Sequence, residues 1–343
     1  MKKLFTLSAL LLASVVFAQD EPKKLSISGS VDAYYRTNLT SSDASITEVL
    51  DENGMGTGEF IPQSFATSFA DQTGFGLGMA NVILSYEGEK TGAVADLAFG
   101  TRGTQAVGDG TDLYINQLYA YWNVSESTTL TMGRFNTYLG YEVISPVANF
   151  NYSTSYLFSN GPFSHVGLKA DFAISDDFSL MLAVMNPTDK NNNLVGGYAL
   201  GAQLGYAGQF LNFYYDDKEV LGFEIDYTGG FNLSDALFLG INAAYQTMDN
   251  AGFYGAALYP QFAATESFSI GLRGELFGNH EKDVDDLPSV FATTLTASYT
   301  LENLIIKPEV RLDSWSNDMP YVNNDLDASK SLAAFTLAAI YSF

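Results

Sequence analysis

Apolar and polar residues alternate along most of the chain beyond residue 24. In Leu25–Asn38, apolar side chains fall mainly on one face, while serines and the charged Asp32 and Arg36 fall on the other. A period of two with one polar face is the pattern of a half-buried β-strand. The same pattern recurs in later stretches, among them 165–174, 237–246, 268–276 and 306–313.

Connections between the predicted strands alternate in length. Short gaps fall near residues 88–90, 125–127, 175–177, 207–208, 232–235, 263–266 and 302–303. Longer or more variable gaps fall near residues 40–71, 102–112, 138–162, 187–196, 217–221, 249–252, 278–288 and 316–330. Seven turns and eight loops give sixteen strands, with both chain ends on the short-turn side.

This alternation of connections predicts the fold class. Transmembrane barrels of the bacterial outer membrane have short periplasmic turns, longer extracellular loops and an even number of strands. A soluble β-sandwich also alternates apolar and polar residues, but nothing requires its long and short connections to alternate. We therefore predict an all-β, transmembrane antiparallel β-barrel of about 16 strands. The number is fixed only to within one hairpin, because the gaps 217–221 and 249–252 are turn-sized.

Three features do not fit a regular barrel. Residues 72–87 alternate poorly, which leaves the register of that strand undefined. Pro260 and Pro308 fall inside predicted strands, where each removes a ladder hydrogen bond. We expect a closed barrel to accommodate them at bulges or beyond the true strand ends.

The N-terminus has the pattern of an export signal. Two lysines precede an apolar run that ends in a cleavage-site pattern at Ala18. We expect residues 1–18 to be a signal peptide and residues 19–343 to form a single barrel domain. The apolar run is too short for a spanning helix, and Gln19 stands where a lipid anchor would need a cysteine.

Composition narrows the class further. The 343-residue chain has no cysteine, which excludes disulfides and thiolate metal sites. Its net charge is −23, or −25 once the two N-terminal lysines leave with the signal peptide. A chain this acidic does not bind nucleic acid, whose backbone requires a basic surface. Aromatic residues make up 14% of the chain, and this apolar surface excludes disorder.

The most unusual connection is the segment 138–162. It is rich in Asn, Ser, Tyr and Phe, and Glu142 is its only charge. It is too long for a hairpin turn and too aromatic for a flexible linker. We predict two alternatives: it folds into the barrel mouth as a constriction, or it lies on the surface, held by its own Tyr and Phe side chains.

Aromatic residues concentrate near the predicted strand ends. Membrane barrels carry aromatic girdles at the two lipid–water levels, although tyrosine also favours strands in general. The chain ends in SLAAFTLAAIYSF, with Phe335, Tyr341 and the terminal Phe343 on one face. This pattern resembles the closing strand by which the barrel-assembly machinery recognises its clients, so we expect that machinery to be a partner.

Two stretches carry a family resemblance. One is ISGSVDAYY at residues 27–35, and the other is GRFNTYLGYEVISPVANFNYSTSYLFSNGPFSHVGL at residues 133–168. Together they resemble the putative beta-barrel porin-2 (OmpL-like) family, common in bacteroidetes-type outer membranes. The resemblance implies a pore for small solutes in the outer membrane of a Gram-negative bacterium, surrounded by outer-membrane lipid. Trimers are common among porins of this size, so a homotrimer is one assembly that the resemblance allows.

Polar residues on the strand faces opposite the apolar ones supply candidates for the lumen. Sixteen strands leave a water-filled lumen, and faces turned away from lipid line it. The pore-lining or constriction candidates are Arg134, Glu142, Asn149, Asn151, Lys169, Asp171, Arg273, Glu275, Lys307, Glu309, Arg311 and Asp313.

The acidic charge of the chain bears on selectivity. An acidic surface attracts cations within a Debye length, ~8 Å at physiological salt, so we expect a mild cation preference. For any single candidate charge, the alternative is a solvated interior position without effect on selectivity.

Catalytic and metal-binding patterns are poor. Ser164 adjoins His165, but adjacent strand residues point to opposite faces, so they do not form a nucleophile–base pair. Asp283, Asp285 and Asp286 form a weak Ca²⁺ candidate that lacks the spacing of a calcium loop, and a solvated acidic loop is the alternative. We expect no enzyme activity and no cofactor.

Two functions fit the sequence. The first is a porin that lets small hydrophilic solutes or ions diffuse passively. The second is a barrel whose extracellular loops bind a ligand or partner, which the long loops at 40–71 and 316–330 favour somewhat. Conductance measurements distinguish the two.

Overall fold

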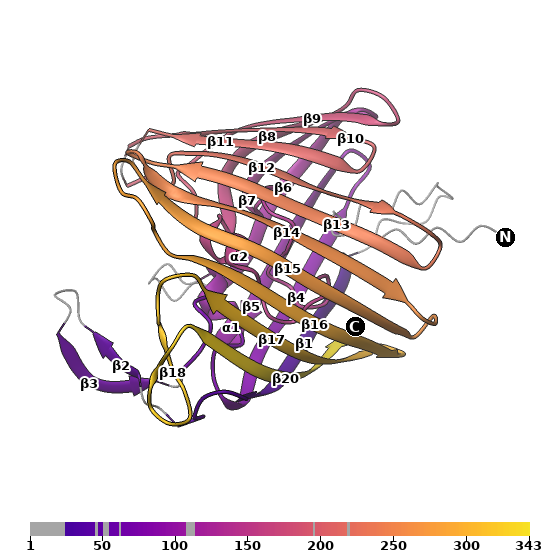
Figure 1. Ribbon diagram of the computed structural model, residues 1–343. Helices are drawn as coiled ribbons and strands as arrows, with labels where there is room; N and C mark the ends of the chain where they lie inside the picture. The colour runs from indigo at the N-terminus through magenta and orange to yellow at the C-terminus, as the bar shows by residue number, and fades with distance from the viewer. Residues whose placement is uncertain are drawn as a thin grey trace.

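The computed structural model describes residues 25–44, 47–50, 55–61, 63–107, 114–194, 196–217 and 220–343, so the predicted signal peptide, residues 1–18, lies outside the described residues. Sixteen strands form one closed barrel (Figure 1). They are β1 (Leu25–Asn38), β4 (Gly74–Glu87), β5 (Thr91–Phe99), β6 (Ile115–Ser125), β7 (Thr128–Asn136), β8 (Ser164–Ala173), β9 (Phe178–Met185), β10 (Ala199–Tyr206), β11 (Gln209–Asp216), β12 (Phe223–Asn232), β13 (Leu237–Thr247), β14 (Ala251–Ala263), β15 (Phe268–Glu281), β16 (Ser289–Leu301), β17 (Leu304–Trp315) and β20 (Ser331–Ser342). The predicted fold class and strand number are confirmed.

Neighbouring strands pair in antiparallel register around the whole ring. The first and last strands close it, with Val31 opposite Tyr341 and Tyr35 opposite Leu337. Beyond the last paired residues, Gly29 and Phe343 exchange two backbone hydrogen bonds of 3.0 Å. Closure leaves the barrel without an unpaired sheet edge, which is the condition for a β-structure to span lipid.

The two faces of the wall differ as the alternation predicts. Large apolar side chains on the outer face are exposed, among them Phe75, Leu77 and Met132 at 91%, 71% and 70%. Alternate residues point inward, and many of these are polar or charged. A sheet that meets lipid on one side and a polar interior on the other requires this division.

Both prolines stay inside strands, so the expectation of bulges or mispredicted ends is wrong. Pro260 pairs with Leu239, and Pro308 pairs with Leu337. On the opposite side of each proline two residue pairs are missing from the ladder, yet the register before and after the gap is the same. Because proline lacks only its own N–H, the pairing is interrupted toward one neighbour alone.

The poor alternation in residues 72–87 has a structural cause. Leu77 lies opposite Ala33 and Ala80 lies opposite Val31, so β4 carries one extra residue at this point. The bulge reverses the parity of the strand, and Gly78 and Met79 are both buried there. A β-bulge of this kind shifts a regular period-two pattern by one position.

Connections at the two ends of the barrel differ as predicted. The short turns are two to four residues long, whereas every connection at the other end is longer except the three-residue turn between β13 and β14. Two small hairpins lie in these loops, β2 (Thr47–Leu50) with β3 (Gly56–Ile61) and β18 (Tyr321–Val322) with β19 (Ala328–Ser329). Figure 1 shows the β2–β3 hairpin projecting away from the barrel.

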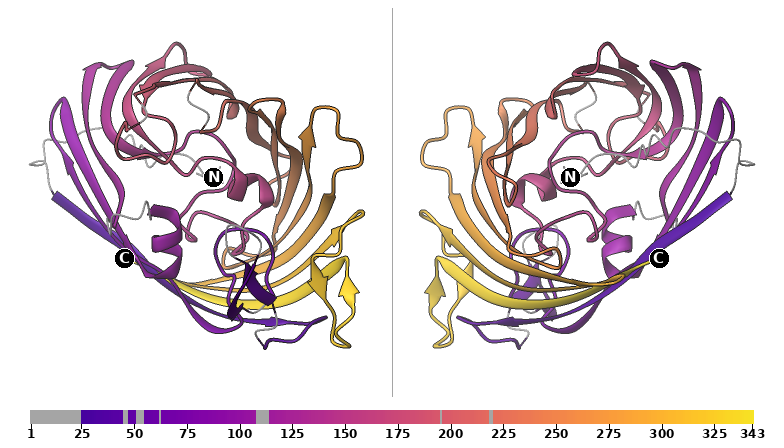
Figure 2. Two further views of the ribbon diagram at one scale, coloured as in Figure 1. Left: turned by 90° about the vertical axis from the view of Figure 1, so that its left-hand side faces the viewer. Right: turned by 90° about the vertical axis from the view of Figure 1, so that its right-hand side faces the viewer.

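Two short helices complete the fold, α1 (Gly100–Val107) and α2 (Tyr156–Asn160). Both lie within the ring of strands when the barrel is viewed along its axis (Figure 2). In the described part of the chain, no helix is long and apolar enough to cross a membrane.

Candidate functional site

The segment 137–163, between β7 and β8, turns inward and runs across the interior of the barrel (Figure 2). It contains few regular hydrogen bonds of its own apart from α2. Most of its residues from 149 to 158 are nevertheless buried, including Tyr152, Thr154 and Ser155 at 0% exposure. We call this the infolded segment. Side chains of the barrel wall form hydrogen bonds with its backbone and polar groups.

Two wall carboxylates each bind a pair of successive backbone N–H groups. Glu275 on β15 accepts hydrogen bonds from Tyr156 and Leu157 at 2.9 and 2.8 Å, at the first turn of α2. Glu309 on β17 accepts from Tyr152 and the residue after it at 2.8 and 3.1 Å. Hydrogen bonds to an ionised acceptor are roughly twice as strong as neutral ones. Each carboxylate therefore fixes the course of the segment at one point.

A buried ion pair joins the segment to the same wall. The Arg273 guanidinium lies 2.7 Å from Glu142, and their side chains are 0% and 4% exposed. Arg273 also donates to the Ser153 carbonyl at 2.7 Å and to the Thr294 hydroxyl at 3.0 Å. The second oxygen of Glu142 accepts from the Ser155 N–H at 2.6 Å. The pair therefore connects the beginning of the segment, its middle and the wall.

Tyrosine hydroxyls and further wall residues extend this contact. Tyr152 donates to Asp32 on β1, and Tyr156 donates to Asp313 on β17 at 2.7 Å. Arg311 forms a two-pronged ion pair with Asp313, with distances of 2.8 and 2.9 Å. All five side chains are buried. These two tyrosines of the segment are thus bound to the wall through their hydroxyl groups.

Two asparagines of the segment also contact β16 and β17, one through its side chain and the other through its backbone. Asn151 donates to the Thr296 hydroxyl at 2.7 Å, and Thr296 in turn donates to Glu309 at 2.7 Å. Lys307 donates to the backbone carbonyl of Asn149. Together with the carboxylates, these bonds leave the segment fixed against β15, β16 and β17.

The two ends of the segment are held by other parts of the molecule. The Gly140 N–H donates to Asp226 on β12 at 3.0 Å, and the Tyr138 hydroxyl donates to the Phe213 carbonyl on β11 at 2.7 Å. At the exit, the outer-loop residue Asp189 accepts from the Phe163 N–H at 3.0 Å. Burial raises the pKa of Asp189 above its ordinary value, and hydrogen bonds from this backbone oppose the shift.

Two other segments fill the interior beside it. Residues 63–73 of the first loop and α1 both enter the barrel from the long-loop end. Arg36 donates to the carbonyls of Gln63 and Asp71, each at 3.2 Å. Arg102 on α1 donates to the Tyr152 carbonyl at 2.8 Å, and its guanidinium lies 4.6 Å from the Phe69 ring centre.

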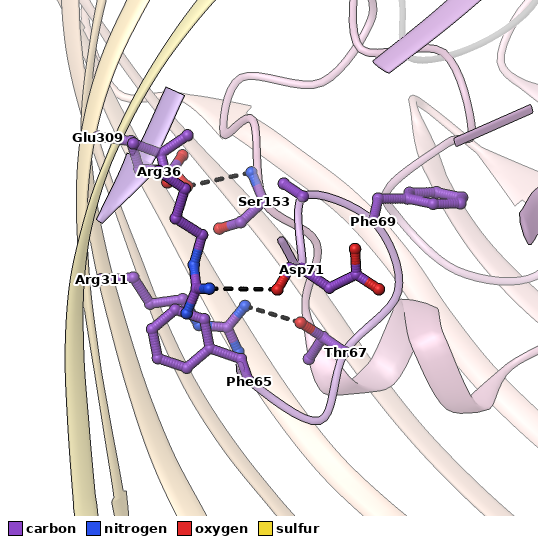
Figure 3. Close-up of a pocket in the computed structure, with 10 residues that line it drawn as sticks. Arg36, Phe65, Thr67, Phe69, Asp71, Ser153, Glu309 and Arg311 are labelled. Atoms are coloured by element: carbon purple, nitrogen blue, oxygen red, sulfur yellow. Dashed lines mark hydrogen bonds between the residues drawn. The ribbon is translucent and has the colours of Figure 1, made fainter. Parts of the chain in front are cut away.

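A small pocket lies where these segments meet the wall (Figure 3). The guanidinium carbons of Arg36 and Arg311 lie 5.2 and 4.3 Å from the ring centre of Phe65. Arg311 also donates to the Thr67 hydroxyl at 3.0 Å. The wall arginines thus hold the first-loop segment in the same way as they hold the infolded segment.

Nine of the twelve predicted lumen candidates come together where the infolded segment meets β15 and β17. All nine are buried and take part in the contacts above: Glu142, Asn149, Asn151, Arg273, Glu275, Lys307, Glu309, Arg311 and Asp313. Three lie elsewhere, namely Arg134, Lys169 and Asp171.

Arg134 and the β8 pair differ in their surroundings. Arg134 is opposite Leu118, which is 50% exposed, and its guanidinium donates to the Asn116 carbonyl at 3.2 Å. Lys169 and Asp171 form an ion pair of 2.7 Å, with side chains 16% and 40% exposed. Only this pair, among the twelve candidates, is partly open to solvent.

Some contacts have no signal in the sequence. Arg102 lies in a Gly- and Thr-rich gap that shows no apolar helical period, so neither α1 nor its role is predicted. The bonds by which Glu275 and Glu309 hold the infolded segment go to its backbone N–H groups, which carry no residue-specific pattern. His165 is buried and bonds to Thr137 at 3.0 Å, while Ser164 donates to Asp189, so the two adjacent residues do not bond to each other.

The weak calcium candidate lies in the loop after β15. Asp283, Asp285 and Asp286 are exposed. Across the part of the chain that the structure describes, no three carboxylate or histidine side chains come close enough to hold a metal ion.

Comparisons with known proteins agree with this architecture. The sequence model of the family described as "Putative beta-barrel porin-2, OmpL-like" matches residues 24–343. A search of curated proteins found no match.

Several solved porins share the fold. An anion-selective porin from Comamonas acidovorans has a TM-score of 0.57 at 9% identity, covering 94% of this chain and 100% of that one. OmpT of Vibrio cholerae, in trimer form, has a TM-score of 0.54 at 10% identity, covering 94% and 100%. A mutant of Rh. blastica porin has a TM-score of 0.51 at 14% identity, covering 93% and 100%. At these identities the likeness concerns the fold.

Proposed function

Because the chain belongs to the putative beta-barrel porin-2 (OmpL-like) family, we propose that it lets small hydrophilic solutes and ions diffuse passively across the outer membrane of a Gram-negative bacterium. Family and fold indicate a channel rather than an enzyme. In this proposal the infolded segment narrows the lumen, and the route for solutes passes beside it.

The observation that carries the proposal is the polar, solvent-accessible inner wall toward the short turns. Inward-facing Tyr121, Asn123 and Thr129 are all partly exposed. On the outer face of the same strands, Trp122 and Met132 are 51% and 70% exposed. A barrel with water inside and lipid outside requires this distribution.

A mild cation preference is part of the proposal. Six of the seven short turns carry exposed carboxylates, and the only exposed base in those turns is Lys90. The acidic residues are Glu89, Glu126, Asp176, Asp177, Asp235, Glu266 and Glu302. A ring of like charges at a channel mouth biases the passage of ions of opposite sign.

Reversal potentials in planar bilayers test this preference. Under a KCl gradient, we expect the sign of the potential to indicate K⁺ over Cl⁻. The preference should weaken as total salt rises from 0.1 to 1 M, because the Debye length falls from about 10 to about 3 Å. A potential of the opposite sign at low salt would refute cation preference and leave the proposal of a pore intact.

The second candidate function is binding of a ligand or partner by the outer loops. It is supported by the β2–β3 hairpin, which extends beyond the barrel (Figure 1), and by the filled outer half of the lumen. Liposome swelling distinguishes the two functions. A pore admits uncharged pentoses and excludes large oligosaccharides, whereas a closed binding barrel admits neither.

Two partner assignments belong to the same proposal. A homotrimer is proposed from the family, and chemical cross-linking in native outer membranes tests it. The barrel-assembly machinery is proposed to recognise the last strand, whose terminal Phe343 is 53% exposed and bonds to Gly29. Deletion of Phe343 is expected to reduce the heat-modifiable, membrane-inserted fraction severalfold, whereas equal insertion would contradict this assignment.

A further inference from the structure

Charged side chains on the inward face of the wall fall into two groups. Most are buried. Several of them bond to the infolded segment or to residues 63–73, whereas Asp96 accepts from the wall residue Asn116 and Asp216 accepts from the loop after β11. These buried charges are Asp32, Arg36, Asp96, Asp216, Glu224, Asp226, Arg273, Glu275, Lys307, Glu309, Arg311 and Asp313, none more than 8% exposed. Ions that enter the lumen therefore do not reach the carboxylates or guanidiniums of this group.

The second group lies toward the short turns, where the segments end. Along β8, exposure rises from 1% for His165 to 40% for the Asp171 side chain, so the boundary of the filled region crosses this strand. Lys169 and Asp171 face the lumen on the short-turn side of that boundary. Among the described strand residues at this end, the other charge on the inward face is Glu87, which is exposed at the rim.

The two opposite charges of the pair lie in direct contact, so the loss of either one leaves the other unbalanced. The Lys169 ammonium lies 2.7 Å from one oxygen of Asp171 and 5.7 Å from the ring centre of Phe135. Lys169 is thereby held between a carboxylate and an aromatic face. Asp171 is the more exposed of the two, so the intact pair presents a carboxylate to the lumen while its formal charge is zero.

We propose that the Lys169–Asp171 pair on β8 is the place on the lumen wall where an unbalanced charge acts on passing ions, and that the two partners hold this charge at zero in the native pore. The charges around the infolded segment serve to hold that segment in place. This inference rests on the proposed function, since selectivity requires a conducting pore. It places the charge-sensitive part of the lumen wall on the periplasmic side of the constriction, where water reaches charged side chains, and leaves the cation preference of the native pore to the carboxylates of the short turns.

The expected effect follows from the charge that each substitution leaves. Asp171→Asn leaves Lys169 unpaired and makes the site positive, which disfavours cations. Lys169→Met leaves Asp171 unpaired and makes the site negative, and the methionine keeps the contact with Phe135. In water, a unit charge on the wall acts only weakly on an ion in the lumen, and salt screens the interaction further. We therefore expect each change to alter the cation-to-anion permeability ratio about twofold, in opposite directions.

The experiment compares reversal potentials of the mature chain and its variants in planar bilayers at low salt. Asp176→Asn is the matched control, because it removes the same charge from the exposed turn directly after β8. The double variant Lys169→Met/Asp171→Asn should return close to the wild-type ratio. Heat-modifiable migration of each variant establishes that the barrel is folded.

Opposite shifts for the two single variants, with a smaller shift for the control, are the expected result. Unchanged ratios for both variants would overturn the inference. A shift for Asp176→Asn as large as that for Asp171→Asn would overturn it as well, because a charge at the rim would then act on ions as strongly as a charge at the pair. Absence of current through the wild-type chain would instead reject the proposed pore, so the two failures are distinguishable.

Discussion

Removal of residues 142–160, with a short Gly-Ser linker joining Tyr141 to Gly161, is expected to raise single-channel conductance at least about twofold. A 16-strand barrel encloses an aqueous channel unless other parts of the chain fill it. Here the infolded segment fills the space against β15–β17. Its removal exposes the wall carboxylates and guanidiniums to water, where they need no partner.

The control for this deletion is a matched shortening outside the lumen. Removing residues 47–61 takes away the β2–β3 hairpin, which projects from the barrel (Figure 1), and conductance should stay at the wild-type level. If deletion of 142–160 leaves conductance unchanged while the barrel stays heat-modifiable, the segment is not a constriction.

Arg273→Ala is expected to release the infolded segment without unfolding the barrel. The substitution leaves Glu142 buried without its cation and removes the bonds to Ser153 and Thr294. Breaking one partner of a buried pair costs about 3–5 kcal/mol, and this cost falls on the segment because the strand ladder does not involve the side chain. We expect noisier, larger open levels and new protease cleavage between residues 142 and 160.

Arg36→Ala is the matched control for Arg273→Ala. Arg36 is an equally buried wall arginine, but it holds residues 63–73 through the Gln63 and Asp71 carbonyls. Its loss should expose that segment to protease and leave 142–160 protected. Arg273→Lys keeps the charge but not the fork of donors, so partial release is expected. Identical cleavage patterns for wild type and Arg273→Ala would contradict the anchoring role.

The barrel could be predicted because its determinants are local and repeated. Period-two alternation defines each strand, and the turn residues between strands recur at regular spacing, so the short turns near 88–90 and 302–303 match the structure. The positions of the prolines in the sheet were harder to predict, because the effect of a proline depends on which of the two neighbouring strands its missing N–H would have faced. That difference at Pro260 and Pro308 is set by sheet register and not by the local sequence.

The candidate site was predictable only in part. Position and composition singled out segment 138–162 and most of the charged wall residues that contact it. The sequence did not reveal that these charges are buried. An inward-facing Glu275 looks the same in sequence whether it meets water or the backbone N–H groups of Tyr156 and Leu157. Burial depends on where segments distant in the sequence fold. The partly exposed Lys169 and Asp171 lie in the same alternating pattern as the buried charges, so the sequence does not distinguish the two groups.

The most direct test of the proposed pore is the single-channel conductance of refolded residues 19–343 in a planar bilayer under a salt gradient. We predict discrete, steady open-level steps from a folded, heat-modifiable barrel, with a reversal potential that favours cations. A folded barrel that inserts and carries no current would contradict the proposal that the protein is a pore. It would show that the infolded segment, residues 63–73 and α1 together close the lumen completely.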